Sequence, residues 1–239
     1  MKSLYLLVDC CTVLIPFVFS FHPKLKFYKH FKPFFIANMI TAFLFICWDI
    51  LFTKIGVWGF NPDYVLGIYF FNLPLEEILF FICIPYSCIF TYHCLNLFFK
   101  IEWASKTQNI FVVSLSTFLL CSGIYFQDKL YTASTCISLG IILLLMTYLA
   151  KIKWLAKLVM IYPILLIPFF IVNGILTGSG LPQPIVWYNN AENIGIRLWT
   201  IPVEDIFYGF ELMLINVYLY EMLKHKFNVQ LKKINEQAI

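Results

Sequence analysis

Two short motifs, each a proline followed within two residues by adjacent acids, carry the side chains best suited to chemistry. They are Pro74-Leu75-Glu76-Glu77 and Pro202-Val203-Glu204-Asp205, and each opens a long apolar run. Proline suits the first turn of a helix, and acids there meet the positive end of the helix dipole. One such motif would indicate helix capping, but two copies favour a paired functional site.

The composition indicates where these acids must work. Of 239 residues, 61% are hydrophobic, 19% aromatic and only 13% charged, whereas a soluble domain is about 45–50% apolar and about 25% charged. These values exclude an ordinary soluble globule, a disordered chain and a basic nucleic-acid binder. At roughly 20 residues per span, the apolar runs predict seven membrane-spanning helices near residues 4–21, 34–53, 75–98, 108–125, 132–150, 157–177 and 203–223.

The basic residues predict the orientation of these spans. One side of the membrane would carry Lys24, Lys26, Lys29, Lys32, Lys100, Lys106, Lys151, Lys153, Lys157, Lys224, Lys226, Lys232 and Lys233, and the other only Lys2, Lys54, Lys129 and Arg197. Because cytoplasmic loops are rich in Lys and Arg, we expect an external N-terminus and a cytoplasmic C-terminus. The chain would be a multi-pass protein of the cell inner or plasma membrane.

An internal repeat relates the two motifs. At an offset of 128 residues, Leu73–Leu79 aligns with Ile201–Phe207, Asn61 with Asn189, and Tyr92 with Tyr220. Spans one to three then map onto spans five to seven, and the unpaired fourth span makes the two units parallel, as in membrane repeats about an axis along the membrane normal. We predict an all-α membrane protein with a first three-helix repeat at 1–100, a bridging helix at 101–130 and a second repeat at 131–239.

Further acids gather in the same outer half of the predicted bundle. Asp9 and Asp49 lie toward the outer ends of spans one and two, and Glu211 follows Glu204 by seven residues, about 10.5 Å deeper on the same helix face. An ionisable group inside a span is costly and is by default a functional-site hypothesis. Glu221 lies instead at the inner end beside Lys224, where we expect an interfacial ion pair.

Several other residues receive supporting or substrate-binding roles. Trp58, Trp187 and Tyr188 fit an aromatic belt at the membrane boundary, with cation–π contact as the alternative, and Arg197 either pairs with an acid or remains a loop charge. Phe80, Phe81, Phe207 and Tyr208 either stabilise cations or pack against lipid, and Asn38 and Asn173 would form interhelical hydrogen bonds. The supporting set is Asp49, Trp58, Trp187, Arg197, Tyr208 and Glu211.

Missing motifs narrow the chemistry. The sequence has no G-x-G-x-x-G for a dinucleotide, no aspartate-rich magnesium motif, no His/Cys metal cluster and no lysine in span seven before Lys224 for a retinal Schiff base. We therefore expect neither a metal nor a cofactor. A carboxyl group out of water can stay protonated at neutral pH, so one acid could protonate an alkene and a carboxylate could later deprotonate the cation. A proton-coupled small-molecule transporter remains the alternative.

The two motifs and their surroundings resemble one known family. Trp48-Asp49, Gly56-Val57-Trp58, Asn61-Pro62 and Leu73–Phe81 are similar to the first half of the fused heterodimer-type lycopene cyclases, integral membrane proteins of carotenoid synthesis. The second half is similar at Pro184–Asn189, Gly195–Arg197, Ile201–Phe210 and Tyr220-Glu221. The resemblance covers nearly the whole chain and includes both acidic motifs in order.

This resemblance implies an isomerase-type reaction in which the ψ-ends of lycopene close to β-ionone rings, through γ-carotene to β-carotene, without a flavin. Glu76, Glu77, Glu204 and Asp205 would supply the acid and the base in roles that the sequence does not assign. The implied partners are lycopene or other carotenoids and membrane lipid, with a homo-oligomer possible and no nucleic acid. Ring type, carotenoid length and one-end against two-end cyclisation stay open.

Overall fold

The structure is a computed structural model that describes residues 2–99 and 104–237, with side chains described as far as residue 229. Lys100 and the domain boundary expected at 100–101 lie outside the described residues, and so do the side chains of Lys232 and Lys233.

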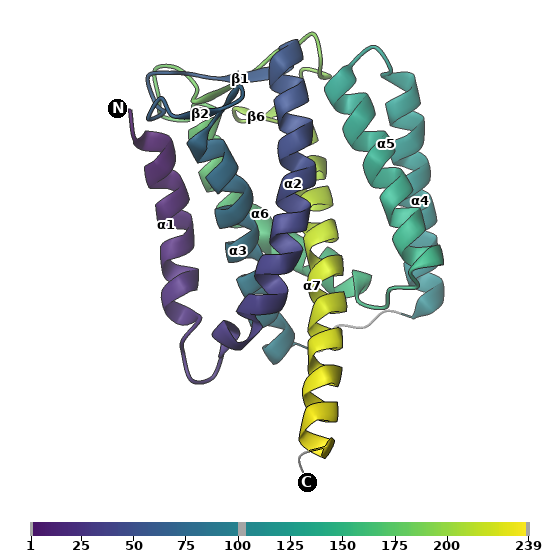
Figure 1. The fold of residues 1–239 in the computed structure, drawn as a ribbon. Helices are drawn as coiled ribbons and strands as arrows, with labels where there is room; N and C mark the ends of the chain where they lie inside the picture. The colour runs from purple at the N-terminus through teal and green to yellow at the C-terminus, as the bar shows by residue number, and fades with distance from the viewer. Residues whose placement is uncertain (1, 100–103, 238–239) are drawn as a thin grey trace.

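Seven α-helices make up most of the described chain, as the apolar runs predict (Figure 1). Six of them are long and apolar enough to cross a membrane, and α1 is a shorter apolar helix. A 3-10 turn, η1 (Phe27–His30), precedes α2, and α5 continues into a π-helical turn, η2 (Leu145–Leu149). The helices are α1 (Leu4–Phe19), α2 (Phe31–Ile55), α3 (Leu75–Phe98), α4 (Ser105–Tyr125), α5 (Leu130–Leu144), α6 (Leu155–Leu176) and α7 (Glu204–Gln237).

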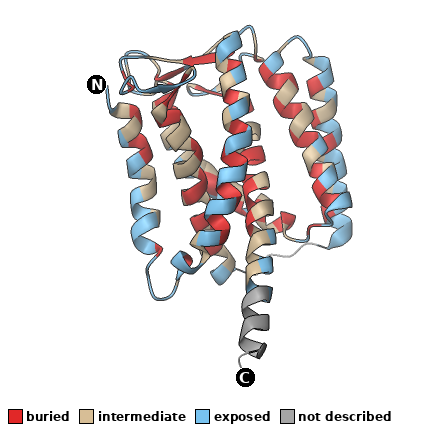
Figure 2. Ribbon diagram, in the orientation of Figure 1, coloured by how far each residue is buried: buried red, intermediate tan, exposed pale blue. Residues whose placement is uncertain are grey.

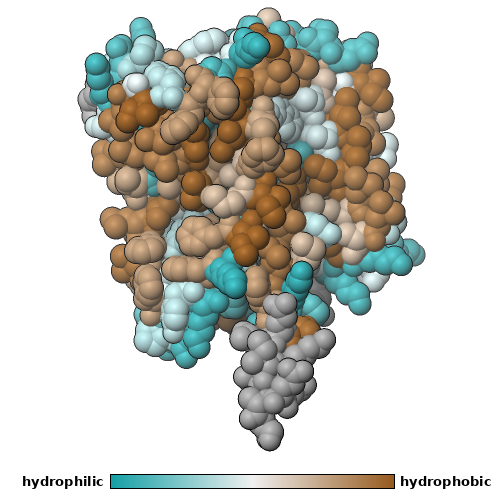
Figure 3. Space-filling view, in the orientation of Figure 1, coloured by the Kyte–Doolittle hydropathy of each residue, from teal (hydrophilic) through white to brown (hydrophobic). Residues whose placement is uncertain are grey.

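The outer surface of the bundle is apolar along its middle. Exposed positions lie mainly on the outward faces of the helices (Figure 2), and hydrophobic side chains cover the middle of the face seen in Figure 3 while polar ones gather toward the two ends. Ile15, Phe43 and Ile167 are each about two-thirds exposed. Because a water-soluble monomer rarely exposes so large an apolar surface, this belt fits a multi-pass membrane protein.

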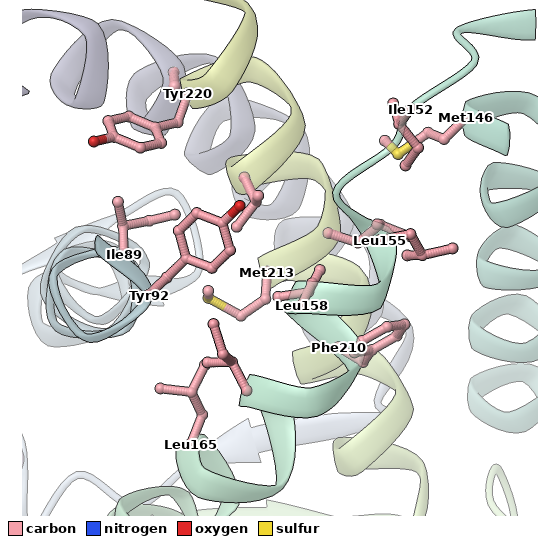
Figure 4. Close-up of a cluster of buried hydrophobic side chains, with 14 of the residues drawn as sticks. Ile89, Tyr92, Met146, Ile152, Leu155, Leu158, Leu165, Phe210, Met213 and Tyr220 are labelled. Atoms are coloured by element: carbon pink, nitrogen blue, oxygen red, sulfur yellow. The ribbon is translucent and has the colours of Figure 1, made fainter. Parts of the chain in front are cut away.

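The interior is formed largely by α3, α6 and α7. Figure 4 shows Ile89 and Tyr92 of α3 facing Met213 of α7, with Leu158 and Leu165 of α6 beside them. All five side chains are buried in one hydrophobic cluster. This packing fixes α3 and α7, the two helices that begin with the acidic motifs, relative to each other.

Two short hairpins lead the chain into the acidic motifs at one end of the bundle. Strand β2 (Tyr69–Phe70) pairs with β3 (Leu73–Pro74) before α3, and β5 (Arg197–Leu198) pairs with β6 (Ile201–Pro202) before α7. Each turn places an aromatic residue at positive φ, Phe71 at 56° and Trp199 at 58°. Both side chains are more than four-fifths exposed, a position that suits anchoring at a membrane interface.

A third strand pair joins the two halves of the chain. Strand β1 (Trp58–Phe60) is antiparallel to β4 (Val186–Tyr188), with Gly59 opposite Trp187. A Cβ on Gly59 would lie 2.4 Å from the Trp187 ring, so only glycine permits this approach. The pairing therefore ties the segment after α2 to the segment after α6 and closes the end of the bundle that carries both motifs (Figure 1).

Helices α4 and α5 form a close antiparallel pair through small residues. A Cβ on Gly123 of α4 would lie 2.6 Å from Ile137 Cγ1 and 3.1 Å from the Ala133 carbonyl oxygen of α5. Small residues let membrane helices approach closely, and this approach supplies much of their packing energy.

We expect Gly123→Val to lower the apparent free energy of unfolding in detergent by about 1–3 kcal/mol, the usual cost of overpacking a close contact. Val113→Leu, on the half-exposed face of the same helix, is the matched control and should leave the unfolding midpoint unchanged. Equal midpoints for Gly123→Val and the unaltered chain would contradict the close packing of α4 against α5.

Candidate functional site

The four acids of the two motifs occupy the first turns of α3 and α7 and are all buried. Glu76 and Glu204 are 0% and 1% exposed, and Glu77 and Asp205 are 8% and 3% exposed. Because a buried charge or polar group is costly unless it is paired or hydrogen-bonded, the partners of each carboxyl group indicate what it can do.

The first acid of each motif is held by a backbone amide of the preceding loop. The Leu66 N–H donates to Glu76 Oε1 at 2.7 Å, and the Ile194 N–H donates to Glu204 Oε1 at 2.9 Å. The Thr132 hydroxyl also donates to Glu204 Oε1, at 2.5 Å. In both acids the second oxygen, Oε2, is buried and has no hydrogen-bond partner among the described residues.

The second acid of the first motif, Glu77, lies among side chains from α1 and α2. The Tyr5 hydroxyl donates to Glu77 Oε2 at 2.5 Å, and the Asp49 carboxyl group lies close enough for its charge to act on Glu77. Asp49 Oδ1 accepts hydrogen bonds from the Trp58 indole N–H and, at 3.4 Å, from the Thr53 hydroxyl. Asp49 is thus brought directly to the first motif.

The second acid of the second motif, Asp205, accepts three hydrogen bonds from neutral donors. The Tyr131 hydroxyl donates to Oδ1 at 2.6 Å, and the Tyr188 hydroxyl and the Asn173 amide donate to Oδ2 at 3.0 Å and 3.1 Å. Burial raises the pKa of the Tyr188 phenol well above its usual value, and the neighbouring Asp205 charge adds to the shift. Tyr188 therefore remains a hydrogen-bond donor at physiological pH.

A cluster of aromatic rings connects the two motifs. The Trp58 ring, whose indole contacts Asp49, lies 5.1 Å from the Tyr131 ring and 6.1 Å from the Tyr188 ring, both of which bind Asp205. The Tyr208 ring lies 5.4 Å from Trp48 and 6.3 Å from Trp58. We call Trp48, Trp58, Tyr131, Tyr188 and Tyr208 the aromatic cluster. Both motifs border it, so the acids of the two halves share one region.

The interpretation of Trp58 as a residue of an external aromatic belt is wrong. Its side chain is only 6% exposed, because its N–H is committed to Asp49 and its ring packs in the cluster. Trp187, in contrast, is 43% exposed and lies at the rim of the β1–β4 pair, so the two tryptophans have different surroundings.

The remaining charged residues of the supporting set are more peripheral. Glu211 lies on α7 seven residues after Glu204, and its Oε2 accepts a hydrogen bond from the Ser138 hydroxyl at 2.8 Å. Arg197 forms no ion pair in the described part of the chain, since its guanidinium donates to the Thr200 carbonyl and the Asn190 side chain at 2.7 Å and 2.8 Å. It therefore stabilises the β5–β6 hairpin, as a loop charge would.

Two further expectations concern residues outside the motifs. Asn38 donates to the Phe81 carbonyl of α3 at 3.0 Å and Asn173 donates to Asp205 of α7, which confirms the predicted interhelical hydrogen bonds. The predicted ion pair of Glu221 with Lys224 is present at 3.6 Å. Among residues 2–99 and 104–237, no group of three or more His, Cys, Asp or Glu side chains could hold a metal ion.

The sequence analysis missed five groups that hold the acids. They are the hydroxyls of Tyr5, Tyr131 and Thr132, and the loop amides of Leu66 and Ile194. The repeat offset does contain a signal, because Leu66 and Ile194 are 128 residues apart and donate to equivalent acids. Amide donors of this kind leave no trace in residue type.

Comparison with known proteins gives a consistent result. The model of the lycopene cyclase family matches residues 2–95 and residues 128–223, which together are most of the chain. A bifunctional lycopene cyclase/phytoene synthase from Aspergillus niger is 24% identical over 163 residues, covering 64% of this chain and 26% of that relative. This chain thus matches about a quarter of the length of that relative. No solved structure matches.

We expect Thr132→Val to lower the free energy of unfolding by about 1–3 kcal/mol, because it leaves a buried carboxyl oxygen with one donor fewer. Thr132→Ser, which keeps the hydroxyl, should retain most of the stability. Chemical denaturation in detergent would measure both. Ser134→Ala is the matched control, since Ser134 is exposed and its hydroxyl contacts only carbonyls of its own helix. Equal stability of Thr132→Val and Ser134→Ala would contradict this role.

Proposed function

The chain belongs to the lycopene cyclase family, and from that premise we propose that it is a lycopene β-cyclase of carotenoid biosynthesis. It would close the ψ-ends of lycopene into β-ionone rings, first to γ-carotene and then to β-carotene. The reaction is an isomerisation, since protonation, ring closure and deprotonation change no oxidation state. The carotenoid would reach the site from the surrounding lipid.

One observation carries this proposal: two buried acidic motifs border a single aromatic cluster in a bundle whose core is mainly apolar. A carboxyl group shielded from water can hold the proton that an alkene must receive. Aromatic faces attract positive charge, so the cluster suits the carbocation that follows protonation. We propose Glu76, Glu77, Glu204 and Asp205 as the acid–base groups, with Asp49, Tyr208 and Glu211 in supporting roles.

We also propose the division into repeats at 1–100 and 131–239 with a bridging helix at 101–130. It is supported by hydrogen bonds that recur at the same offset. The Leu75 N–H donates to the Ile68 carbonyl at 2.8 Å, and the equivalent Val203 N–H donates to the Ile196 carbonyl at 3.0 Å. Across the β1–β4 junction, the Asn61 N–H donates to the Ile185 carbonyl and the Asn189 N–H to the Val57 carbonyl.

The decisive test uses the purified chain in liposomes with lycopene and no added flavin or nicotinamide. We expect cyclic carotenoids to form, and we expect Glu76→Gln and Glu204→Gln each to lower the rate by about 10²–10⁴-fold, the usual contribution of a proton-transferring group. Pigment extraction with chromatography and mass spectrometry would measure this. The glutamine amide keeps the size of the side chain but carries no transferable proton.

Glu221→Gln is the matched control, because Glu221 lies midway along α7, well beyond the second motif, in an ion pair with Lys224. Its activity should be close to that of the unaltered chain. Unchanged lycopene in the presence of properly inserted protein would contradict the cyclase function and favour proton-coupled transport. Full activity of both motif variants would remove Glu76 and Glu204 from the chemistry.

The excess of lysines at one end leads us to propose that the acidic motifs lie at the external boundary and that the C-terminus is cytoplasmic. A cysteine introduced at Pro62, in the exposed loop after β1, should react with a membrane-impermeant thiol reagent in intact cells. One introduced at Lys24, in the exposed α1–α2 loop, should react only after the cells are permeabilised. The reverse pattern would invert the proposed topology without changing the proposed residues.

A further inference from the structure

A cavity of about 380 Å³ lies at the end of the bundle opposite to the acidic motifs. Its lining comes from four segments: His30 at the junction of η1 and α2, the last turns of α3, the start of α6 and the middle of α7. The helices alternate in direction, so α2 and α6 begin at this end of the bundle and α3 finishes there (Figure 1). The cavity is therefore separate from the candidate acid site.

The lining carries positive charge that the described chain balances only in part. Lys157 and Lys224 contribute two ammonium groups, and Glu221 contributes the single carboxylate. Lys224 Nζ lies 3.6 Å from Glu221 Oε1, whereas Lys157 forms no ion pair among the described residues. The Lys157 side chain is half-buried. Because a charge that is withdrawn from water needs a partner, the cavity favours an anionic ligand.

Hydrogen-bond donors surround the same space. Helix α6 begins at Leu155, and no side chain caps its first N–H groups, so the positive end of its dipole adds to the field of Lys157 in the first turn. Tyr92 and Asn96 of α3 also line the cavity, and a phenol and an amide each carry a donor. Ammonium groups with neutral donors beside them are suited to binding the oxygens of a phosphate group.

Two histidine rings give the cavity a fixed wall. His93 is only 6% exposed, and its Nε2 donates to the Leu25 carbonyl at 2.9 Å, which joins α3 to the loop before α2. The His30 ring lies 4.9 Å from the His93 ring. A wall that is already held in place costs little ordering when a ligand binds, so the space is preformed for an occupant.

The surroundings of the cavity favour a phosphate group that is attached to a lipid. Leu97 lines the cavity and is 52% exposed, and Phe98 and Phe99 beyond it are 65% and 57% exposed. Trp154, another lining residue, is of a type enriched at the boundary between membrane and water. A phospholipid can therefore place its phosphate group in the cavity while its acyl chains lie along the apolar surface of α3.

We infer that this cavity binds the phosphate group of an anionic phospholipid, with Lys157 and Lys224 in contact with the phosphate oxygens. Basic pockets between membrane helices are suited to anionic headgroups. Phosphatidylglycerol carries a net negative charge, whereas the ammonium group of phosphatidylcholine balances its phosphate, so the cavity distinguishes the two. The site goes beyond the proposed cyclase function and does not depend on it. The bound lipid joins α3, α6 and α7 at the end of the bundle away from the acids.

The test titrates the purified full chain in detergent with phosphatidylglycerol or phosphatidylcholine and counts the bound lipids by native mass spectrometry. The unaltered chain should retain one phosphatidylglycerol in preference to phosphatidylcholine. Lys157→Gln combined with Lys224→Gln should weaken phosphatidylglycerol binding by about 25-fold, because each lysine near an anionic headgroup contributes a factor of about five. Inorganic phosphate at the same concentration should not displace the lipid, since it makes no apolar contact.

Matched variants separate the cavity from general attraction to the lysine-rich end. Lys153 and Lys226 are exposed neighbours of the two cavity lysines and do not line the cavity. Lys153→Gln combined with Lys226→Gln removes the same charge and should leave the affinity within about twofold of the original. Lys157→Arg combined with Lys224→Arg keeps the charge and should retain most of the binding.

Tryptophan fluorescence gives a readout that does not depend on the lysine variants. Phosphatidylglycerol with brominated acyl chains should quench the unaltered chain more strongly than brominated phosphatidylcholine does, because Trp154 lines the cavity. Trp154→Phe should abolish that difference, and Trp187→Phe, near the opposite end of the bundle, should preserve it.

Several results would overturn the inference while leaving the cyclase function untouched. Equal affinity for the two lipids, or an equal loss of binding in the two glutamine double variants, would show that no specific site exists. Displacement of phosphatidylglycerol by an equal concentration of inorganic phosphate would assign the cavity to a soluble anion instead of a lipid. A quenching difference that survives Trp154→Phe would place the bound lipid elsewhere.

Discussion

Burial of carboxyl groups in an apolar bundle is the constraint on which the rest of the structure depends. An acid removed from water must be protonated, paired or hydrogen-bonded, and an unsatisfied buried polar group costs about 1–3 kcal/mol. Six acids of the described chain, Asp9, Asp49, Glu76, Glu204, Asp205 and Glu211, are no more than 3% exposed, and Glu77 is 8% exposed. The hairpins, the loop amides and the tyrosines at the starts of α1 and α5 are best understood as the means of meeting that demand.

The helix starts show how this demand shapes the backbone. Pro74 and Pro202 end the strands β3 and β6, and each helix begins directly beyond its hairpin. The hairpin holds the preceding loop so that an amide ten residues upstream points at the first acid. The positive end of the helix dipole adds a further stabilising contribution to negative charge at this place. The aromatic residues at the hairpin turns, Phe71 and Trp199, would keep the assembly at the level of the membrane boundary.

The sequence predicts the helices well and the strands poorly, for a physical reason. A span is a local property of about 20 residues of one chain segment, so its hydrophobicity identifies it. Six of the expected ranges lie within a few residues of the observed ones, but α7 continues to Gln237, well beyond the expected end at 223, because its last turns are polar and leave no hydrophobic signal. The pairing of β1 with β4 joins segments about 128 residues apart, and no local pattern encodes it. The burial of Trp58 depends on this pairing and on Asp49, which explains why its position suggested a surface belt instead.

The acids could be identified from residue type because charge is rare inside a span, but their partners could not. A tyrosine in an aromatic-rich chain carries no distinguishing mark, and a loop amide carries none at all. The repeat offset is the exception, since it relates Leu66 to Ile194 and Glu76 to Glu204 before any coordinates are known. A sequence repeat therefore predicts which interactions recur, while the places where the two copies differ must be read from the structure.

The free oxygens of the first acids bear on the choice between helix capping and chemistry. Capping is complete when a carboxylate satisfies backbone N–H groups and is itself satisfied, yet Oε2 of both Glu76 and Glu204 is buried without a partner in the described residues. Asp9 lies near Glu76, and the charge of Glu76 acts on it. Neither carboxyl oxygen of Asp9 has a hydrogen-bond partner among the described residues. If these acids served only as helix caps, side chains whose polar atoms are all hydrogen-bonded would give a more stable protein. The acid–base roles proposed for Glu76 and Glu204 would account for carboxyl oxygens that meet no hydrogen-bond donor among the described residues.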